Sequence, residues 1–276
     1  MSSIDRHPRL AAVGDNCVDI LRPSGRRFIG GNAVNVAVQF SALGGRSSYF
    51  GAIGDDENGT LTREALIGHR VDVTHLVRRP LPTAYTQIDV SPEGERSIGF
   101  EDFGACAGYA PDDDAMAALL SFDHVHIGWL DDGGAVRRRL SAAGRSVSQD
   151  ITVNARPENL GVEGLSIVFS SIDGSHEDAS RLAGDLFGRG ARGVVVTRGA
   201  RGSSVFVNGV SADLPARPIV PVDTTGAGDS YIAGFLHALL SGASPERAGE
   251  HGAACAAATC MHEGGFPQRP VDAHRA

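Results

Sequence analysis

Short apolar segments alternate with helical patterns along the whole chain. The apolar segments are typical of buried strands, and the segments between them repeat apolar positions every three or four residues, as amphipathic helices do. The expected strands are Leu10–Gly14, Ser47–Ile53, His124–Gly128, Val147–Thr152, Ser166–Ser170, Gly193–Thr197 and Ser203–Val207. The expected helices are Asn32–Leu43, Asp56–Leu66, Ala115–Leu120, His176–Gly188, Ala227–Leu240 and Pro245–Met261. Such alternation predicts an α/β fold with a mostly parallel sheet and helices on both faces.

One segment departs from this alternation. Thr83–Val90 alternates as a strand does, Pro92-Glu93-Gly94 predicts a turn, and Arg96–Phe100 can return as a second strand. We interpret residues 83–104 as a β-hairpin inserted into one domain that spans residues 1–276. The hairpin is either an edge of the main sheet or a lid over a substrate site.

Composition narrows the functional classes. The 33 acidic and 25 basic residues give a formal net charge of −8, which argues against a nucleic-acid partner or an anionic membrane surface. No apolar stretch is long enough to span a bilayer, and residues 1–9 contain no apolar signal core, so we expect a cytoplasmic protein. The chain has no lysine, which excludes Schiff-base chemistry and a Walker-type phosphate loop. Its four cysteines have no zinc-site spacing.

The clearest chemical signal is the run Asp223-Thr224-Thr225-Gly226-Ala227-Gly228-Asp229 at the start of an expected helix. Its glycines let the backbone approach a ligand, and amides at a helix start stabilise anionic oxygen. Asp229 can take a proton from a substrate hydroxyl while the amides of Gly226, Ala227 and Gly228 stabilise a transferring phosphoryl group. A shorter string would indicate only a glycine-rich turn with an acidic helix start. The full run predicts a phosphate site with a base beside it.

The same run, continued by Ser230 and by Ala233-Gly234-Phe235, resembles the C-terminal signature of the ribokinase-like sugar kinases, the PfkB family. The segment 30–37 resembles that family's Gly-Gly-x-x-x-Asn-x-Ala element, and 51–59 resembles the segment that follows it. These elements occur in the family's order and span nearly the whole chain. The resemblance implies a three-layer αβα sandwich with a small β lid, and transfer of a phosphoryl group from ATP to a sugar hydroxyl with Mg²⁺.

The resemblance also assigns roles to residues. Asp229 is the expected base, with Gly226, Ala227 and Gly228 as the anion hole. The residues expected at ATP are Thr197, Gly199, Gly202, Thr225, Gly226 and Gly228, with the helix from Pro245 as part of the adenine wall. Those expected at the sugar are Asp15, Asn16, Gly30, Gly31 and Asn35. Asp15 ends a strand, where open α/β sheets bind ligands. The structural alternatives are that Asp15 merely forms a turn and that Asn32 merely caps a helix.

Within the family, residues 14–20, 30–38 and 254–257 most resemble the fructoselysine kinases, which implies phosphorylation of O6 of an Amadori compound. Such a substrate carries an ammonium group, which Glu101 or Asp102 at the end of the hairpin could bind, although either could be a solvated turn carboxylate. A kinase of another ketose, deoxy-keto acid or nucleoside and a catalytically silent sugar- or nucleotide-binding regulator remain alternatives. The apolar hairpin residues need cover, either from the main domain or from a second subunit of a homodimer.

The sequence departs from the family at the expected metal site. Relatives carry an Asn-x-x-Glu element after a central strand, which helps to hold Mg²⁺ through water. Here Ser166–Ser170 leads into 171–177 without the Asn. Glu177 or Asp173 could still serve a hydrated Mg²⁺, because magnesium keeps several waters. Glu177 is therefore the candidate metal residue, and weakened metal use is the alternative.

Overall fold

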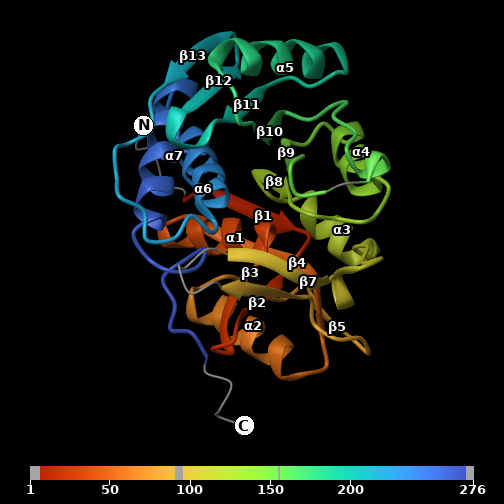
Figure 1. Cartoon of the computed structure of the whole chain (residues 1–276). Helices are drawn as coiled ribbons and strands as arrows, with labels where there is room; N and C mark the ends of the chain where they lie inside the picture. Colours follow the sequence, from red (N-terminus) through yellow and green to blue (C-terminus); the bar gives the residue numbers. More distant parts are fainter. Residues whose placement is uncertain (1–6, 91–95, 155, 272–276) are drawn as a thin grey trace.

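The computed structural model describes residues 7–90, 96–154 and 156–271. A nine-stranded sheet in the order β13-β12-β11-β10-β9-β8-β1-β4-β5 forms its centre (Figure 1). Neighbouring strands run parallel from β11 to β5. Strand β12 runs antiparallel to both of its neighbours, β11 and β13. The strands are β1 (Arg9–Val13), β4 (Arg46–Gly54), β5 (Leu76–Arg79), β8 (His124–Ile127), β9 (Val147–Asp150), β10 (Ile167–Ser171), β11 (Val194–Thr197), β12 (Ser203–Val207) and β13 (Val210–Leu214).

Helices cover both faces of this sheet (Figure 1). They are α1 (Asn32–Ala42), α2 (Glu57–Gly68), α3 (Asp113–Leu119), α4 (Ala135–Ala142), α5 (His176–Gly188), α6 (Ala227–Leu240) and α7 (Pro245–Thr259). On one face, Phe235 of α6 lies edge-on against Phe169 of β10. On the other face, Leu140 and Leu186 of α4 and α5 share a core cluster with Val168. The expected α/β architecture with helices on both faces of a mostly parallel sheet is confirmed.

In the nine-stranded sheet and its covering helices, one helix and two strands were not expected from the sequence. Helix α4 carries three arginines, which obscure the i, i+4 spacing of its buried Val136 and Leu140. Strands β5 and β13 lie at the two edges of the sheet, where only one neighbour strand pairs with each and polar residues are tolerated. Their sequences therefore lack the continuous apolar run of a central parallel strand.

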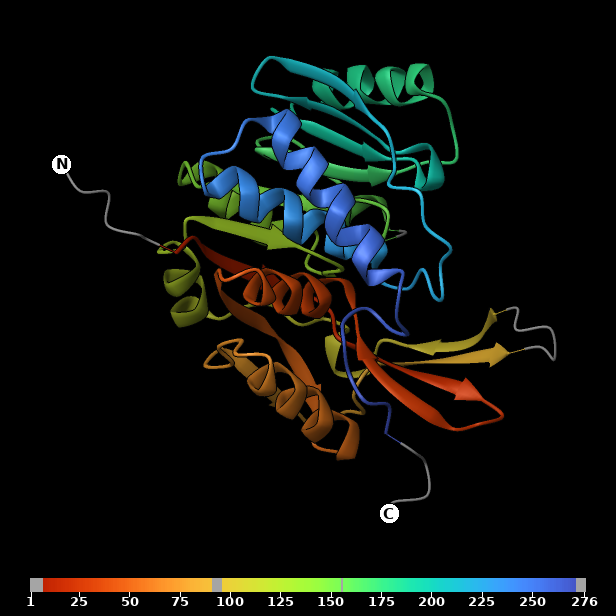
Figure 2. The same ribbon diagram turned by 90° about the vertical axis from the view of Figure 1, so that its left-hand side faces the viewer.

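A second sheet of four strands projects from the main body (Figure 2). Its order is β3-β2-β6-β7, with β2 (Cys17–Arg22), β3 (Arg26–Gly30), β6 (Tyr85–Val90) and β7 (Arg96–Asp102). The expected hairpin is present as β6 and β7, but it is half of a larger sheet rather than an isolated insertion or an edge of the main sheet. The sequence did not predict β2 and β3, which carry four charged side chains at Asp19, Arg22, Arg26 and Arg27. The predicted turn at Pro92-Glu93-Gly94 lies outside the described residues.

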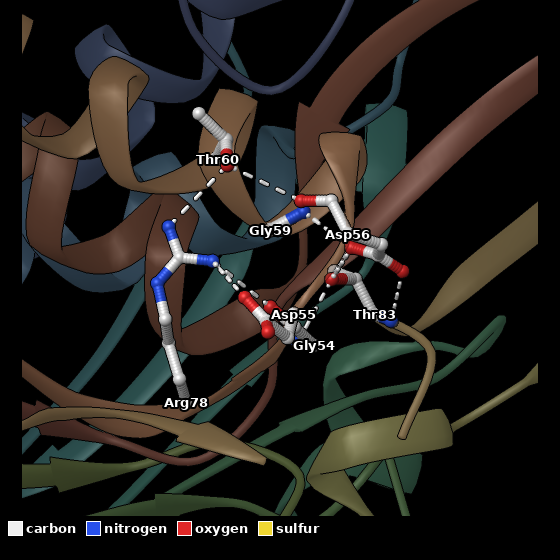
Figure 3. Close-up of polar contacts among 7 residues, drawn as sticks. All are labelled: Gly54, Asp55, Asp56, Gly59, Thr60, Arg78 and Thr83. Atoms are coloured by element: carbon white, nitrogen blue, oxygen red, sulfur yellow. Dashed lines mark hydrogen bonds and ion pairs between the residues drawn. The ribbon is translucent and has the colours of Figure 1, made fainter. Parts of the chain in front are cut away.

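The carboxylate of Asp56 joins this second sheet to the main body (Figure 3). Its Oδ1 accepts hydrogen bonds from the Gly59 amide at 2.8 Å and from the Thr83 hydroxyl at 2.5 Å. Its Oδ2 accepts the Thr83 amide at 2.8 Å, and the Gly54 amide donates to the same hydroxyl at 2.9 Å. One side chain thus caps α2 and fixes the residue that leads into β6. In the described part of the chain, no helix is long and apolar enough to cross a membrane.

Candidate active site

The first turn of α6 places Asp229 beside the start of α1, at the carboxyl end of the parallel strands. Gly226 precedes the helix with φ 73°, and a Cβ there would lie 2.4 Å from the Cα of Gly265, so only glycine fits. A Cβ on Gly228 would meet no atom within 4 Å. The amides of this turn are therefore held by a tight backbone contact on one side and open to a ligand on the other.

The Asp223 carboxylate shapes the loop that leads to this turn. Its Oδ1 accepts the Thr225 amide at 3.0 Å and the Thr225 hydroxyl at 2.8 Å, while its Oδ2 accepts the Gly264 amide at 3.0 Å. These bonds join the glycine-rich run to the segment after α7. Hydrogen bonds within the protein thus shape this loop without a ligand.

Two amides of α1 hold the Asp229 carboxylate. Asn32 Nδ2 donates to Oδ1 at 2.7 Å and Asn35 Nδ2 donates to Oδ2 at 2.6 Å. Burial raises the pKa of Asp229 to about 7, the hydrogen bond from Asn35 opposes the rise, and the neighbouring carboxylates of Asp150 and Asp15 add to it. A carboxyl group with such a pKa can exchange a proton near neutral pH, as a general base must.

Asn35 also presents an acceptor to the site. Its Oδ1 is buried and has no hydrogen-bond partner among the described residues. A buried acceptor without a partner is costly, so a ligand hydroxyl is the natural donor. The amide of Asn35 can thus contact both the base and a sugar.

The carboxylate of Asp15 bonds to the protein backbone. It accepts the amides of Asn32 at 2.7 Å, Ala33 at 3.2 Å and Trp129 at 3.0 Å, and so caps α1. Burial raises the pKa of Asp15, and these hydrogen bonds oppose the rise. Asp15 thus holds the start of α1, which goes beyond the turn-forming alternative, and binding of sugar hydroxyls by Asp15 stays a prediction.

Asn16, also expected at the sugar, is 1% exposed and points into the protein. Its Nδ2 donates to the carbonyl of Ala52 at 2.7 Å and to the hydroxyl of Tyr49 at 3.1 Å. These bonds secure the segment between β1 and β2 beneath the site. A sugar contact from Asn16 stays a prediction.

Gly31 and Gly30 bring the four-stranded sheet close to α1. Gly31 has φ 101°, and a Cβ there would lie 2.6 Å from the Cα of Asn16. A Cβ on Gly30 would lie 3.7 Å from Asp19 Oδ2 and 3.8 Å from Asn35 Oδ1. The carboxylate of Asp19, on β2, therefore lies near Asn35, whose side-chain amide donates to Asp229.

A row of polar side chains crosses the four-stranded sheet, starting from Asp19. Asp19 of β2 pairs with Thr86 of β6, and Thr86 pairs with Glu101 of β7. Residues paired in this way project from the same face of a sheet. Glu101 is exposed and lies two strands away from Asp19. This row of the four-stranded sheet thus starts at the carboxylate of Asp19 and ends at that of Glu101.

A cavity of about 520 Å³ is lined by Gly228, the residue before Asp229, although Asp229 itself is not among the lining residues. Of the residues expected at ATP, Thr197, Gly199, Gly202 and Gly228 line it, together with Ala227 of the expected anion hole, whereas Thr225 and Gly226 are outside its lining. Helix α7 lines it with Ala253, Ala256 and Ala257, and Cys260, which follows the helix, also lines it. The loop 216–221 supplies further apolar wall. A volume of this size suits a nucleotide, and the small side chains leave room for a flat ring.

The expected metal residue lies apart from this cavity. Glu177 is exposed in the first turn of α5 and is not among the residues that line the cavity. A hydrogen bond from Ser175 lowers the pKa of Glu177, which suits a helix start better than a metal site. The described ranges contain no group of three or more His, Cys, Asp or Glu that could hold a metal. Any Mg²⁺ would thus depend mainly on nucleotide phosphates and water.

Sequence reasoning missed the contacts of Asn32 in this network and the position of Asp19 near Gly30. Asn32 was expected only as a possible helix cap, yet its amide contacts Asp229 and, at 3.1 Å, Asp150. Asp19 was hidden in a segment not recognised as a strand. The polar residues at the first turn of an otherwise apolar helix were the available signal for Asn32.

Comparison with known proteins identifies the family. Residues 8–137 and 162–270 match the model of the pfkB family carbohydrate kinases. The chain belongs to this family. It is 32% identical to fructoselysine 6-kinase from Escherichia coli K12, over 93% of this chain and 99% of that one. It is 30% identical to an ATP-dependent ribose-1-phosphate kinase from Halopiger xanaduensis, over 98% and 91% of the two chains.

The fold agrees with this assignment. The structure of Arabidopsis thaliana ribokinase complexed with ribose and ATP superposes with a TM-score of 0.82 at 24% identity, covering 94% of each chain. The expected ribokinase-like fold is confirmed. As a pfkB-family carbohydrate kinase, the protein is a phosphotransferase that acts on a hydroxyl group.

Proposed function

We propose that this kinase transfers the γ-phosphoryl group of ATP to O6 of fructoselysine or a related Amadori compound. The observation that carries the proposal is the position of Asp229, which directly follows Gly228 in the lining of the nucleotide-sized cavity and accepts a hydrogen bond from Asn35, whose own acceptor has no partner among the described residues. The 32% identity to a fructoselysine 6-kinase supports the choice of sugar. We also propose that the chain is one kinase domain whose four-stranded sheet acts as a lid.

In this mechanism the sugar lies between Asn35 and the lid. Asp229 takes the proton from the attacking hydroxyl, and the amides of Ala227 and Gly228 stabilise the charge of the transferring phosphoryl group. The walls formed by α7 hold the nucleotide and exclude water. Mg²⁺, when bound with ATP, would neutralise charge on the phosphates.

The Amadori nitrogen would be recognised on the lid. Glu101 belongs to the row that starts at Asp19, so a substrate whose hydroxyls lie near Asp19 can extend an ammonium group toward Glu101. A carboxylate favours such a group by charge. An ordinary ketose lacks the ammonium group and gains nothing from Glu101.

A phosphorylation screen tests the proposal. ADP release is measured with fructoselysine, other fructosamines, fructose, ribose and nucleosides, and the product is located by NMR. We expect fructosamines to give the highest kcat/KM, and Asp229→Asn to lower kcat by roughly 10²- to 10⁴-fold. Asp114→Asn, which changes an exposed aspartate in the first turn of α3, is the matched control.

The screen also separates the alternatives. The similarity to a ribose-1-phosphate kinase keeps another sugar as the second candidate, and a higher kcat/KM for ribose derivatives or nucleosides would replace the fructosamine assignment. Absence of sugar-dependent ADP release with every compound would favour a silent regulator. Activity that persists in Asp229→Asn would remove that residue from the mechanism.

The lid also has a surface suited to a second copy of the chain. Ile98 and Phe100 of β7 are 70% and 50% exposed. Ala84, expected to need cover, is buried against Trp129 and Cys106 of the main body. We propose that β7 pairs with a second subunit, which light scattering tests: a monomer at micromolar concentration excludes it, and Ile98→Lys should dissociate a dimer.

A further inference from the structure

A chain of hydrogen bonds between polar side chains leads from the amino ends of β8 and β9 to Asn32. Ser146 Oγ lies 2.8 Å from His124 Nδ1, and His124 Nε2 lies 2.7 Å from Ser148 Oγ. The same Ser148 oxygen is 2.9 Å from His126 Nδ1, and His126 Nε2 is 3.2 Å from Asn32 Oδ1. His124, Ser148 and His126 are each at most 1% exposed. Strands β8 and β9 therefore carry a polar stripe through an otherwise apolar core.

The carboxylates at its end fix the direction of this chain. Asn32 Nδ2 contacts Asp229 Oδ1 at 2.7 Å and Asp150 Oδ2 at 3.1 Å. Asp229 acts as the base only when it is ionised, and an ionised carboxylate only accepts hydrogen bonds, so the amide nitrogen of Asn32 must face it in the active form. Asn32 Oδ1 then faces His126 and needs a donor. His126 must therefore carry its proton on Nε2.

The remaining hydrogen positions follow step by step. Burial lowers the pKa of both His124 and His126 to about 3, so each ring is neutral and has one donor and one acceptor nitrogen. With Nε2 of His126 donating, its Nδ1 accepts from the Ser148 hydroxyl. Ser148 then accepts from Nε2–H of His124, whose Nδ1 accepts from Ser146. Each hydrogen is used once, and no ring nitrogen lacks a partner.

We propose that His126 is a positioning residue for phosphoryl transfer: its Nε2–H holds the Asn32 amide with the nitrogen toward Asp229, and Ser148 and His124 fix the required tautomer. The inference rests on the proposed role of Asp229 as the base. Asn32 cannot rotate its amide without placing an oxygen against two carboxylates and a nitrogen against an N–H. A base held in this way keeps the orientation that proton transfer needs.

The surroundings of Asp229 determine what a change at His126 should do. Besides Asn32 and Asn35 of α1, the groups that act on it are the carboxylates of Asp150 from β9 and Asp15 after β1. The hydrogen bond from Asn32 lowers the pKa of Asp229. Loss of the support from His126 should weaken that bond and raise the pKa further, whereas general loosening of the core would lower thermal stability without this directed shift.

The test compares His126→Leu with His126→Gln, which retains an N–H donor near the position of Nε2. We expect His126→Leu to lower kcat by up to about 100-fold with little change in KM for ATP. The pKa of Asp229, followed by ¹³C NMR of labelled aspartate carboxyl groups, should rise by up to about one unit. His126→Gln should recover most of both effects.

Further variants test whether the change in the pKa of Asp229 depends on this chain of hydrogen bonds. Ser148→Ala should shift the pKa of Asp229 in the same direction by less, because it releases the tautomer but keeps the ring. Ser47→Ala is its matched control: Ser47 is 4% exposed on β4 and donates to the Ala37 carbonyl at 2.7 Å, apart from this chain. In an Asn32→Ala background, His126→Leu should add nothing to the loss of kcat.

The wild-type tautomer gives a readout independent of catalysis. ¹⁵N NMR should show His126 neutral and protonated on Nε2 between pH 6 and 8, about the physiological range. A ring protonated on Nδ1, or an unchanged pKa of Asp229 in His126→Leu and in Ser148→Ala, overturns the inference. If His126→Leu does not fold, Ser148→Ala carries the test. Failure of the wild-type protein to phosphorylate any sugar would instead contradict the proposed function, while the NMR results still decide the positioning of Asp229.

Discussion

The two sides of the site differ in how far the protein itself supports their polar groups. Around Asp229, amides from α1 hold both carboxylate oxygens, and a buried chain of histidines and serines holds one of those amides in turn. On the lid, Glu101 is exposed on a sheet that projects from the main body (Figure 2). The first region can keep one geometry before substrate arrives, whereas the second can adapt to the substrate. Family chemistry would reside in the first region and the choice of sugar in the second.

The largest effect should follow from breaking the supported side at its tightest contact. Gly226→Ala introduces a Cβ 2.4 Å from the Cα of Gly265 at a positive φ, so the start of α6 must move. We expect a stability loss of about 2–4 kcal/mol, measured by urea unfolding, and a loss of most kinase activity. Gly228→Ala, whose Cβ has open space, should keep stability and mainly raise KM for ATP. Equal stability of the two variants would contradict the proposed rigidity.

The pH dependence should report the same side. Burial raises the pKa of Asp229 to about 7, and the base acts only when it is ionised. We therefore expect kcat/KM to fall about tenfold per pH unit below pH 7 and to level off above it, in assays at constant ionic strength. A midpoint near 4, the ordinary value of an aspartate, would show that the burial is lost in solution.

A smaller, substrate-dependent effect is expected on the lid. Glu101→Gln should raise KM for fructoselysine by roughly tenfold, because an ammonium group loses its partner, and leave KM for fructose unchanged. Asp89→Asn, which removes the lid ion pair with Arg22, is the control for a general change of lid charge. An equal rise for both sugars would assign Glu101 to lid structure instead of specificity.

The smallest effect should come from the joint between the two regions. Burial acts to raise the pKa of Asp56, but the hydrogen bonds from Thr83 and Gly59 outweigh it and lower the pKa. Asp56→Asn keeps one of the two acceptor oxygens, and Oδ1 alone accepts from the Gly59 amide and the Thr83 hydroxyl, whereas Asp56→Ala removes both oxygens. We expect Asp56→Ala to cost about 1 kcal/mol of stability and to raise KM for the sugar more than KM for ATP. An unchanged sugar KM would show that Thr83 does not need this anchor.

The elements that the sequence predicted have a clear local pattern of apolar residues. Strands such as β10 and β11 are buried on both faces and read as continuous apolar runs, and α6 combines a glycine-rich start with an apolar stripe. The missed strands β2 and β3 lie in the lid sheet, where charged residues interrupt the pattern. Local pattern therefore failed where one face of a sheet meets solvent or substrate.

The amino-acid sequence by itself determined the α/β architecture and the glycine-rich run that ends at Asp229, because buried strands and phosphate-binding turns require particular residue types at fixed spacing. It also determined the family, through motifs that occur in a set order. Only the tertiary structure decided the partners of Asp229. Asn32, His126 and Asp150 are far apart in the chain and read locally as helix start or core strand, and their hydrogen bonds exist only because α1 packs over the ends of β8 and β9. A contact between distant residues leaves no signal in the local pattern of either one.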